Sequence, residues 1–155
     1  IAYWLTETRV VAIDRSELAC FLTRKNAYKL GLEERVSIWR SDLFNDIQTI
    51  DELQFDFILS NPPYVKEKEW NSLASEIRLY EPKDALVSGP DGLDLIKRIL
   101  YESPPYLKRQ GCLYIEHDPS QVEEIENISI DTQFIKEKVI FDYQKRPRAT
   151  VFIRK

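Results

Sequence analysis

The sequence predicts an α/β fold built around a mostly parallel sheet. Short runs of β-branched and aromatic residues alternate along the chain with segments whose apolar residues recur every three or four positions. This alternation of strand and helix patterns is typical of parallel α/β domains. Acidic residues or an asparagine directly follow the first three runs. Because ligands bind such sheets at the carboxyl ends of the strands, these polar residues indicate a binding crevice.

The first strand and the first helix have the clearest patterns. Residues 9–14 form a short apolar run that ends in an acid, which predicts a buried strand. A helix is expected over residues 16–30, and Gly31 directly after it supplies a stop signal. The helical spacing is carried by Leu18, Ala19, Leu22, Asn26, Ala27 and Leu30.

The alternation continues to the end of the chain. Further strands are expected over residues 36–39, 55–59 and 111–115, with a helix over residues 93–107. Residues 135–141 and 149–153 are again β-rich, and a polar, proline-containing stretch over residues 142–147 joins them. Two strands joined in this way suit an antiparallel hairpin at the edge of the sheet.

Composition and charge limit the classes of protein. With 155 residues, 43% of them hydrophobic, the chain is long enough for one domain over residues 1–155. A net charge of −4 and the lack of a lysine- or arginine-rich stripe argue against direct nucleic-acid binding. Cys20 and Cys112 lie far apart without metal-ligand spacing, which favours a reducing, intracellular compartment and no metal. No apolar run approaches the roughly 20 residues of a membrane span, so no membrane partner is expected.

The strongest functional signal follows the third strand and reads Ser60-Asn61-Pro62-Pro63-Tyr64. Two consecutive prolines fix the backbone φ angles and remove two N–H donors. The result is a stiff corner that offers carbonyl oxygens and the Asn61 amide to the crevice. In the alternative interpretation this segment is only a tight turn, with Tyr64 in the core.

A corner of this kind suits the NH2 group of a planar amide or an aromatic ring. Such a nitrogen is a poor nucleophile because its lone pair is delocalised, and it becomes positive as it attacks a methyl group. The Asn61 side-chain oxygen and the Pro62 carbonyl oxygen could accept its two hydrogens, aim the lone pair and stabilise the developing charge. Tyr64 could pack flat on the substrate plane.

The corner resembles the (N/D)PP(Y/F) motif of class I methyltransferases, which act on planar amino or amide nitrogens. Residues 76–93 read EIRLYEPKDALVSGPDGL and resemble the stretch that follows this motif in the HemK/PrmC release-factor glutamine methyltransferases. The likeness continues through Leu107 to Gln121 and covers almost the whole chain. Residues 81–92 are expected either to contact the substrate or to form a rigid surface loop.

The resemblance implies an activity and a substrate site. The family uses S-adenosylmethionine to methylate the side-chain amide of the glutamine in the Gly-Gly-Gln motif of a peptide chain release factor. The asparagine and first proline of the motif grip that glutamine, and these roles fall here on Asn61 and Pro62. Pro63 and Tyr64 complete the expected substrate site. The expected catalytic residues are Asn61, Pro62 and Tyr64.

The resemblance also implies a cofactor site. Asp14 resembles the acid that accepts hydrogen bonds from the two ribose hydroxyl groups of the cofactor. Asp42 and Leu43 resemble the pair at the adenine, where the acid accepts from the exocyclic amine and the leucine covers a ring face. Asn61 is a further expected cofactor contact. Each acid also has a structural interpretation, since Asp14 and Glu17 have capping-box spacing and Asp42 could cap a loop.

Two features of the family are expected before Ile1. They are the helical N-terminal domain and the first strand with its glycine-rich loop, which none of the four glycines of this sequence could form. A sheet whose first strand is missing would expose a central edge, which is an association hazard. We therefore expect either a longer natural protein or a degenerate gene product, and cofactor binding by this piece alone is in question.

The remaining candidate residues have structural interpretations. His117, the sole histidine, follows a predicted strand and is expected to be structural. No catalytic base is required of it, because the methylated nitrogen can lose its proton to water. Arg146 and Arg148 are expected in a solvated or ion-paired turn, with ribosomal RNA as the alternative contact. Trp70 is the aromatic residue best placed in the sequence to contact a partner protein.

Two rival functions stay open at this point. The first is an amino-group methyltransferase that acts on adenine or guanine in nucleic acid through the same corner, which would require a basic face or a target-recognition domain. The second is a catalytically silent, methyltransferase-like binding module. For the location of the protein, the overall resemblance favours the mitochondrion over the cytoplasm.

Overall fold

The computed structural model describes residues 1–47 and 54–155, and all predicted site residues lie within these ranges. The chain divides into two compact units, Ile1–Glu52 and Leu53–Lys155. Among the described residues, the first unit has a two-stranded sheet and the second a four-stranded sheet. The single domain expected over the whole chain stays a prediction, and each unit is described by itself.

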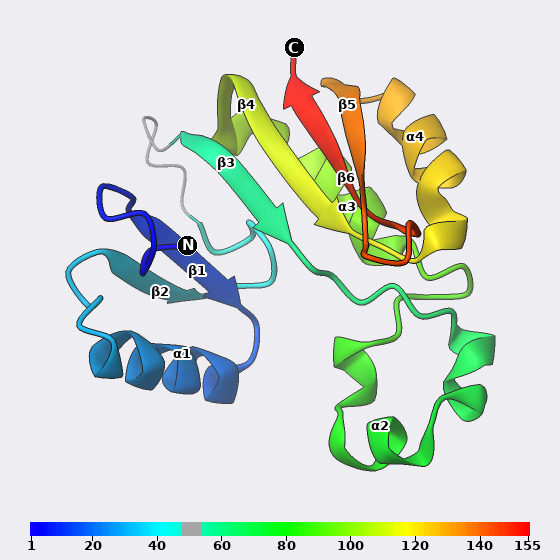
Figure 1. Ribbon diagram of the computed structural model, residues 1–155, viewed down its shortest axis with the longest axis horizontal. Helices are drawn as coiled ribbons and strands as arrows, with labels where there is room; N and C mark the ends of the chain where they lie inside the picture. The colour runs from blue at the N-terminus through cyan, green and yellow to red at the C-terminus, as the bar shows by residue number, and fades with distance from the viewer. Residues whose placement is uncertain (48–53) are drawn as a thin grey trace. The chain divides into compact units, whose positions relative to one another are not determined.

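The first unit is a pair of parallel strands with one helix packed beside it (Figure 1). β1 (Val10–Asp14) pairs in parallel with β2 (Val36–Arg40), and α1 (Glu17–Lys29) connects them. Its apolar cluster consists of Ala2, Ala27 and Leu32, with Val10, Val36 and Ile38 packed against it. The two strands and the helix predicted for this part of the chain are confirmed.

The ends of α1 follow from the residues that flank it. Ser16 is the N-cap, and its hydroxyl accepts a hydrogen bond from the Ala19 amide at 3.3 Å. Gly31 has a φ of +64°, the left-handed conformation in which glycine commonly ends a helix. Leu18 and Leu22 of the predicted apolar stripe are nevertheless exposed. The pattern therefore predicted the helix correctly, but not the face that it buries.

The second unit is a four-stranded sheet in the order β3-β4-β6-β5 (Figure 1). Its strands are β3 (Phe55–Ser60), β4 (Leu107–Glu116), β5 (Phe134–Phe141) and β6 (Pro147–Arg154). β3 and β4 run parallel, whereas β6 is antiparallel to both β4 and β5. The predicted edge hairpin, formed by β5 and β6, is confirmed. Each unit also contains one parallel pair of strands, β1 with β2 and β3 with β4.

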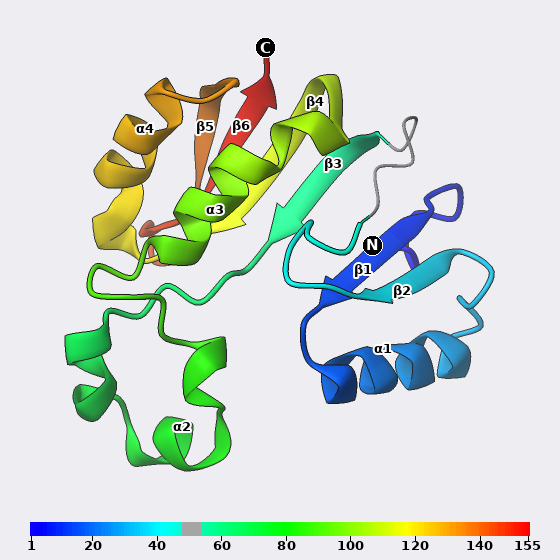
Figure 2. The same ribbon diagram turned by 180° about the vertical axis from the view of Figure 1, so that it is seen from behind.

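Two helices pack on one face of this four-stranded sheet. α3 (Asp94–Glu102) and α4 (Val122–Ile130) contact each other and lie on the same side of the strands (Figures 1 and 2). The buried apolar residues of the unit include Ile96, Ile99, Leu100, Leu107, Leu113, Ile115, Ile125, Phe134, Val151 and Phe152. The shorter helical turns are η1 (Glu67–Ser72), α2 (Ser75–Tyr80), η2 (Lys83–Ala85), η3 (Pro104–Tyr106) and η4 (Pro119–Gln121).

The helix predicted over residues 93–107 is shorter in the structure. It ends at Glu102, because Pro104 and Pro105 lack the amide hydrogens that a further helical turn needs. α4 is an additional helix that the sequence patterns did not predict. Among the described residues, no helix has the length and apolar character required to cross a membrane.

β4 begins earlier than predicted, at Leu107. Its first half departs from regular pairing with β3, since Phe55 pairs with Leu107 whereas Phe57 pairs with Cys112. The intervening residues Lys108, Arg109 and Gln110 are exposed. Extra residues of this kind form a bulge, and their polar side chains give no strand pattern in the sequence.

Phe152 tests the core of the second unit, and Phe141 on the same hairpin provides a matched control. Phe152 is 0% exposed and Phe141 is 57% exposed. We predict that Phe152→Ala lowers the free energy of unfolding by about 3–5 kcal/mol, because it leaves a buried cavity. Phe141→Ala should cost about 1 kcal/mol or less. Urea unfolding of both variants checks this, and similar losses would contradict the assigned core.

Candidate functional site

The corner predicted to bind substrate lies at the carboxyl end of β3. β3 ends at Ser60, which pairs with Ile115 of the parallel strand β4. In the residues that follow, Asn61 is exposed, Pro62 is buried, and Pro63 and Tyr64 are partly buried. The buried ring of Pro62 anchors the corner, while the Asn61 side chain is accessible to a ligand.

The side chain of Gln121 hydrogen-bonds to the backbone of Tyr64, the last residue of the corner. Gln121 is 3% exposed, and its Nε2 donates to the Tyr64 carbonyl at 3.1 Å and to the Asp91 carbonyl at 3.2 Å. Its Oε1 accepts from the Asp118 amide at 3.0 Å, within the capping box that begins η4. Sequence reasoning did not assign Gln121 to the site. The available signal was the capping-box spacing from Asp118 to Gln121 directly after a strand.

The Tyr64 side chain is engaged by the edge hairpin. The Tyr64 phenol, as the largest cause, and the Glu116 carboxylate, as a lesser one, raise the pKa of Arg148 on β6. Arg148 Nη2 lies 3.3 Å from Glu116 Oε1. Arg146 Nη2 lies 2.9 Å from Asp142 Oδ2, so the predicted ion-paired turn is confirmed. The packing of Tyr64 on a substrate plane stays a prediction.

A later segment of the chain pairs with the residue that directly follows the corner. Val65 pairs with Val87 in a parallel bridge, and the Val65 amide donates to the Leu86 carbonyl at 2.8 Å. Lys97 Nζ lies 2.7 Å from the Asp91 carboxylate, and this hydrogen bond lowers the pKa of Asp91. Backbone and side-chain contacts therefore hold a rigid loop beside the corner. Direct contact of this loop with a substrate stays a prediction.

The two acids predicted to bind cofactor lie at one edge of the first unit. Asp14 ends β1, and its carbonyl accepts from the Ser41 amide at 3.1 Å, so that Asp42 follows beside it. The exposed Asp14 carboxylate accepts from the Ser16 amide at 2.8 Å, whereas the N-cap of α1 is Ser16 itself. Leu43 has a φ of +53°, which turns the chain sharply after β2. Carboxylates at neighbouring strand ends fit the hydroxyl and amine donors of a nucleoside.

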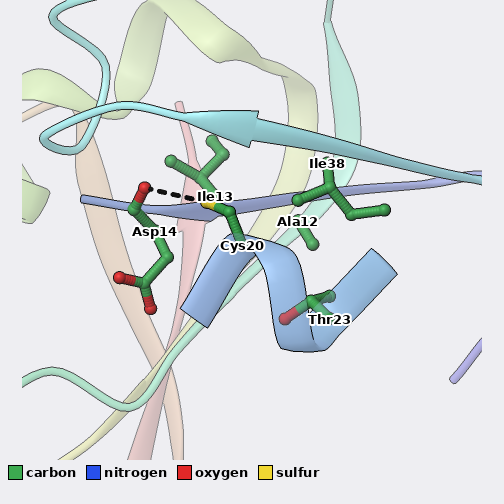
Figure 3. Close-up of a pocket in the computed structure, with 6 residues that line it drawn as sticks. All are labelled: Ala12, Ile13, Asp14, Cys20, Thr23 and Ile38. Atoms are coloured by element: carbon green, nitrogen blue, oxygen red, sulfur yellow. Dashed lines mark hydrogen bonds between the residues drawn. The ribbon is translucent and has the colours of Figure 1, made fainter. Parts of the chain in front are cut away.

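A small cavity lies next to Asp14 in the same unit (Figure 3). Its volume is about 60 Å³, and it is lined by Ala12, Ile13, Asp14, Cys20, Thr23 and Ile38. The Cys20 thiol donates to the Asp14 carbonyl at 3.4 Å. Since ligand pockets usually enclose about 300–1,000 Å³, this cavity is space between the strands and α1 and not a nucleoside site.

The predicted site residues fall into two sets that belong to different units. The structure brings Asp14, Asp42 and Leu43 to one edge of the first unit, and it places the Asn61 to Tyr64 corner in the second. The cofactor contact expected of Asn61 stays a prediction. Within the part of the chain that the structure describes, no group of three or more His, Cys, Asp or Glu residues is placed to hold a metal.

His117 is a buried structural residue at the end of β4. It is 0% exposed, and its Nδ1 lies 2.9 Å from the Asp118 carbonyl, which can only accept, so Nδ1 carries the proton. Its Nε2 lies 2.8 Å from the Thr150 hydroxyl on β6 and accepts from it in the neutral ring. Burial lowers the pKa of His117. These contacts use both ring nitrogens, as expected for a structural histidine.

The lowered pKa of His117 predicts a pH dependence of stability. The unfolded state, with a histidine pKa of about 6.5, binds a proton more readily than the folded state. The contribution of neutral His117 to the free energy of unfolding is therefore fully present above about pH 6.5. It is lost as the pH falls below this value, by at most about 1.4 kcal/mol per pH unit. Urea unfolding of the natural protein and of His117→Gln between about pH 7.5 and about pH 5.5 checks this. Parallel stability curves for the two proteins would contradict it.

The chain is similar to known methyltransferases. The chain matches the family model of the methyltransferase small domain over residues 1–91. It is 40% identical over 119 residues to the release factor glutamine methyltransferase of Rhodopirellula baltica, a match that covers 77% of this chain and 40% of that protein. The human MTRF1L release factor glutamine methyltransferase is 39% identical over 122 residues, with 77% and 36% covered. The ribosomal protein uL3 glutamine methyltransferase of Francisella tularensis is 38% identical over 115 residues, with 74% and 35% covered.

A solved structure gives the same fold. A methyltransferase from Pyrococcus furiosus superposes with a TM-score of 0.68 at 18% identity, and the match covers 98% of this chain and 66% of that one. The fold is therefore that of class I methyltransferases, as predicted. The chain belongs to the methyltransferase small domain family, and its curated relatives confirm the resemblance to HemK/PrmC proteins. It spans 40% and 36% of the lengths of the first two relatives.

Proposed function

We propose that the chain is the catalytic part of an S-adenosylmethionine-dependent methyltransferase. In this proposal the protein methylates the side-chain amide of the glutamine in the Gly-Gly-Gln motif of a peptide chain release factor. The observation that carries the proposal is the corner at the carboxyl end of β3, exposed at Asn61 and anchored by the buried Pro62. Relatives named as glutamine methyltransferases support it. Because the chain spans less than half of them, activity and substrate are proposed for the whole protein.

S-adenosylmethionine is the cofactor that the family implies, and it supplies an electrophilic methyl group when bound. Asp14 would accept hydrogen bonds from the ribose hydroxyl groups and Asp42 one from the adenine amine, with Leu43 against the ring. The proximity of Asp14 to Ser41 at neighbouring strand ends supports these roles. Asn61 would be a further contact, as the family resemblance implies.

The corner acts mainly by placement. The amide nitrogen of glutamine keeps its lone pair in conjugation, so its attack needs a fixed direction and stabilisation of the positive charge that develops. Asn61 Oδ1 and the Pro62 carbonyl oxygen accept the two amide hydrogens. They thereby fix the direction of attack and stabilise the developing charge, and Pro63 keeps the backbone stiff behind them. The nitrogen releases a proton to water after it gains the methyl group, so no residue of the corner has to act as a base.

Two rival functions lack specific support. A methyltransferase for adenine or guanine in nucleic acid would need a basic face, whereas the chain has a net charge of −4. The Arg146 and Arg148 guanidinium groups are paired with carboxylates. A silent binding module would keep the fold without cofactor affinity. Calorimetry of the complete natural protein with S-adenosylmethionine separates this case, because an enzyme must bind the cofactor.

The acceptor protein is identified by mass spectrometry of substrates incubated with the complete natural protein. We predict that the release factor gains one methyl group at the glutamine of its Gly-Gly-Gln motif. Ribosomal protein uL3 is the appropriate second substrate, since one relative bears that activity in its name. Methylation of uL3 alone, or of a release-factor residue other than this glutamine, would refute the substrate assignment.

Asn61→Ala tests the residue that grips the amide. We predict that methyl transfer falls by about 100-fold, by analogy with the loss of one preorganised polar contact in a transition state. Cofactor affinity should change less, since the ribose and adenine contacts proposed for Asp14 and Asp42 remain. The matched control is Asn127→Ala, which alters a different exposed asparagine that lies on α4, away from the motif in sequence. Equal rates for Asn61→Ala and this control would remove Asn61 from its role.

The location of the protein belongs to the same proposal. A release factor as partner places the enzyme inside the cell, and the overall resemblance favours the mitochondrion over the cytoplasm. Microscopy of the tagged complete protein with a mitochondrial marker tests this part. A signal that stays in the cytoplasm would assign the enzyme to a cytoplasmic release factor.

A further inference from the structure

Gln121 is a buried amide whose polar atoms join three separate segments of the second unit. Its Nε2 donates to the carbonyl oxygens of Tyr64 and Asp91, at 3.1 and 3.2 Å. Its Oε1 accepts from the backbone amide of Asp118 at 3.0 Å. A side-chain amide has two N–H donors and one acceptor oxygen, so every polar atom of this one is used. At 3% exposure, water cannot readily replace these bonds.

The partner segments approach each other closely enough to exclude a side chain at Gly92. Gly92 has a φ of +77°, and a Cβ atom there would lie 2.2 Å from the Tyr64 oxygen and 2.8 Å from Gln121 Nε2. Only glycine leaves room for this approach. The close contact between the corner and the loop that precedes α3 therefore depends on the backbone at Gly92 as well as on the Gln121 side chain.

These contacts hold the corner at both of its ends. On one side Ser60 is paired in the sheet with Ile115. On the other side the Tyr64 carbonyl is bound by Gln121, and the next residue, Val65, is held in its bridge to Val87. Between these anchors the two prolines cannot change φ. The direction in which the corner presents its oxygens thus depends on groups outside the corner itself.

We propose that Gln121 is a positioning residue for methyl transfer, which acts through the Tyr64 carbonyl to fix the orientation of Asn61 and Pro62. The inference rests on the function proposed above and adds to it a residue outside the substrate site. Gln121 touches neither substrate nor cofactor in this account. Its loss should impair the chemical step by misplacing the acceptor oxygens, since small displacements of catalytic groups cost up to about 100-fold in rate.

Gln121→Leu removes all three hydrogen bonds at similar volume. We predict that kcat for the glutamine substrate falls about 10- to 100-fold in the complete natural protein, while cofactor affinity changes little. Gln144→Leu, at an exposed glutamine of the β5–β6 turn, is the matched control and should keep the natural kcat. A natural kcat in a folded Gln121→Leu protein would overturn the proposal.

Gln121→Glu keeps the proposal testable if the leucine variant does not fold. Its carboxylate would set negative oxygens against the carbonyls of Tyr64 and Asp91, and protonation would restore one donor. The ratio of its kcat to that of the natural protein should therefore rise as the pH is lowered. A ratio that stays near one throughout would overturn the proposal, because a residue needed only for folding gives no such profile.

The failure of this inference and that of the proposed function give different results. If the natural protein methylates the glutamine and Asn61→Ala lowers this rate by about 100-fold, but the Gln121 variants keep the natural kcat and pH profile, only the positioning role is wrong. If the natural protein binds cofactor but methylates no glutamine, the proposed function fails and the positioning role fails with it.

Discussion

The hydrogen bonds that the buried Gln121 amide makes to Tyr64 and Asp91 connect the candidate substrate corner to the loop that precedes α3. β3 and β4 bring the ends of two parallel strands to one edge of a sheet, but strand pairing alone does not determine how the following loops lie. In this chain a fully bonded amide and a glycine with no room for a side chain determine it. The presentation of Asn61 to a ligand, as proposed above, would depend on that arrangement.

The edge hairpin supports the same corner from another direction. The Tyr64 phenol raises the pKa of Arg148, which is paired in turn with Glu116 at the end of β4. His117, next along the chain, is bonded to Thr150 on the same strand of the hairpin. The C-terminal strands therefore support the site as well as the core, because polar contacts from β6 reach the residues that follow both β3 and β4.

Sequence patterns predicted the strands well, because buried parallel strands are short β-branched runs that few other elements produce. Helix ends were predicted where a local residue determines them, as Ser16 and Gly31 do for α1. The end of α3 was misjudged although Pro104 marks it, because the apolar spacing continues past that proline. The buried face of α1 and the existence of α4 depend on tertiary packing, which a local pattern does not contain.

For the candidate site, the sequence predicted the position of the Asn61-Pro62 corner at a strand end, but not the contacts that hold it. Asn61 and Pro62 form a motif with an evident chemical use, and they occupy the predicted strand end. Gln121 is far from them in sequence, and the positioning role proposed for it depends on contacts with Tyr64 and Asp91 that only the fold creates. The spacing of polar residues after β4 could have identified it as a cap, but not as a partner of the corner.

The central claim is that the corner formed by Asn61 and Pro62 captures a planar NH2 group through two oxygen acceptors. A crystal structure of the complete natural protein with S-adenosylhomocysteine and a peptide containing Gly-Gly-Gln tests it most directly. We predict that the glutamine Nε2 lies about 2.9 Å from both Asn61 Oδ1 and the Pro62 carbonyl oxygen. A glutamine amide bound elsewhere, with these oxygens turned away from it, would contradict the account.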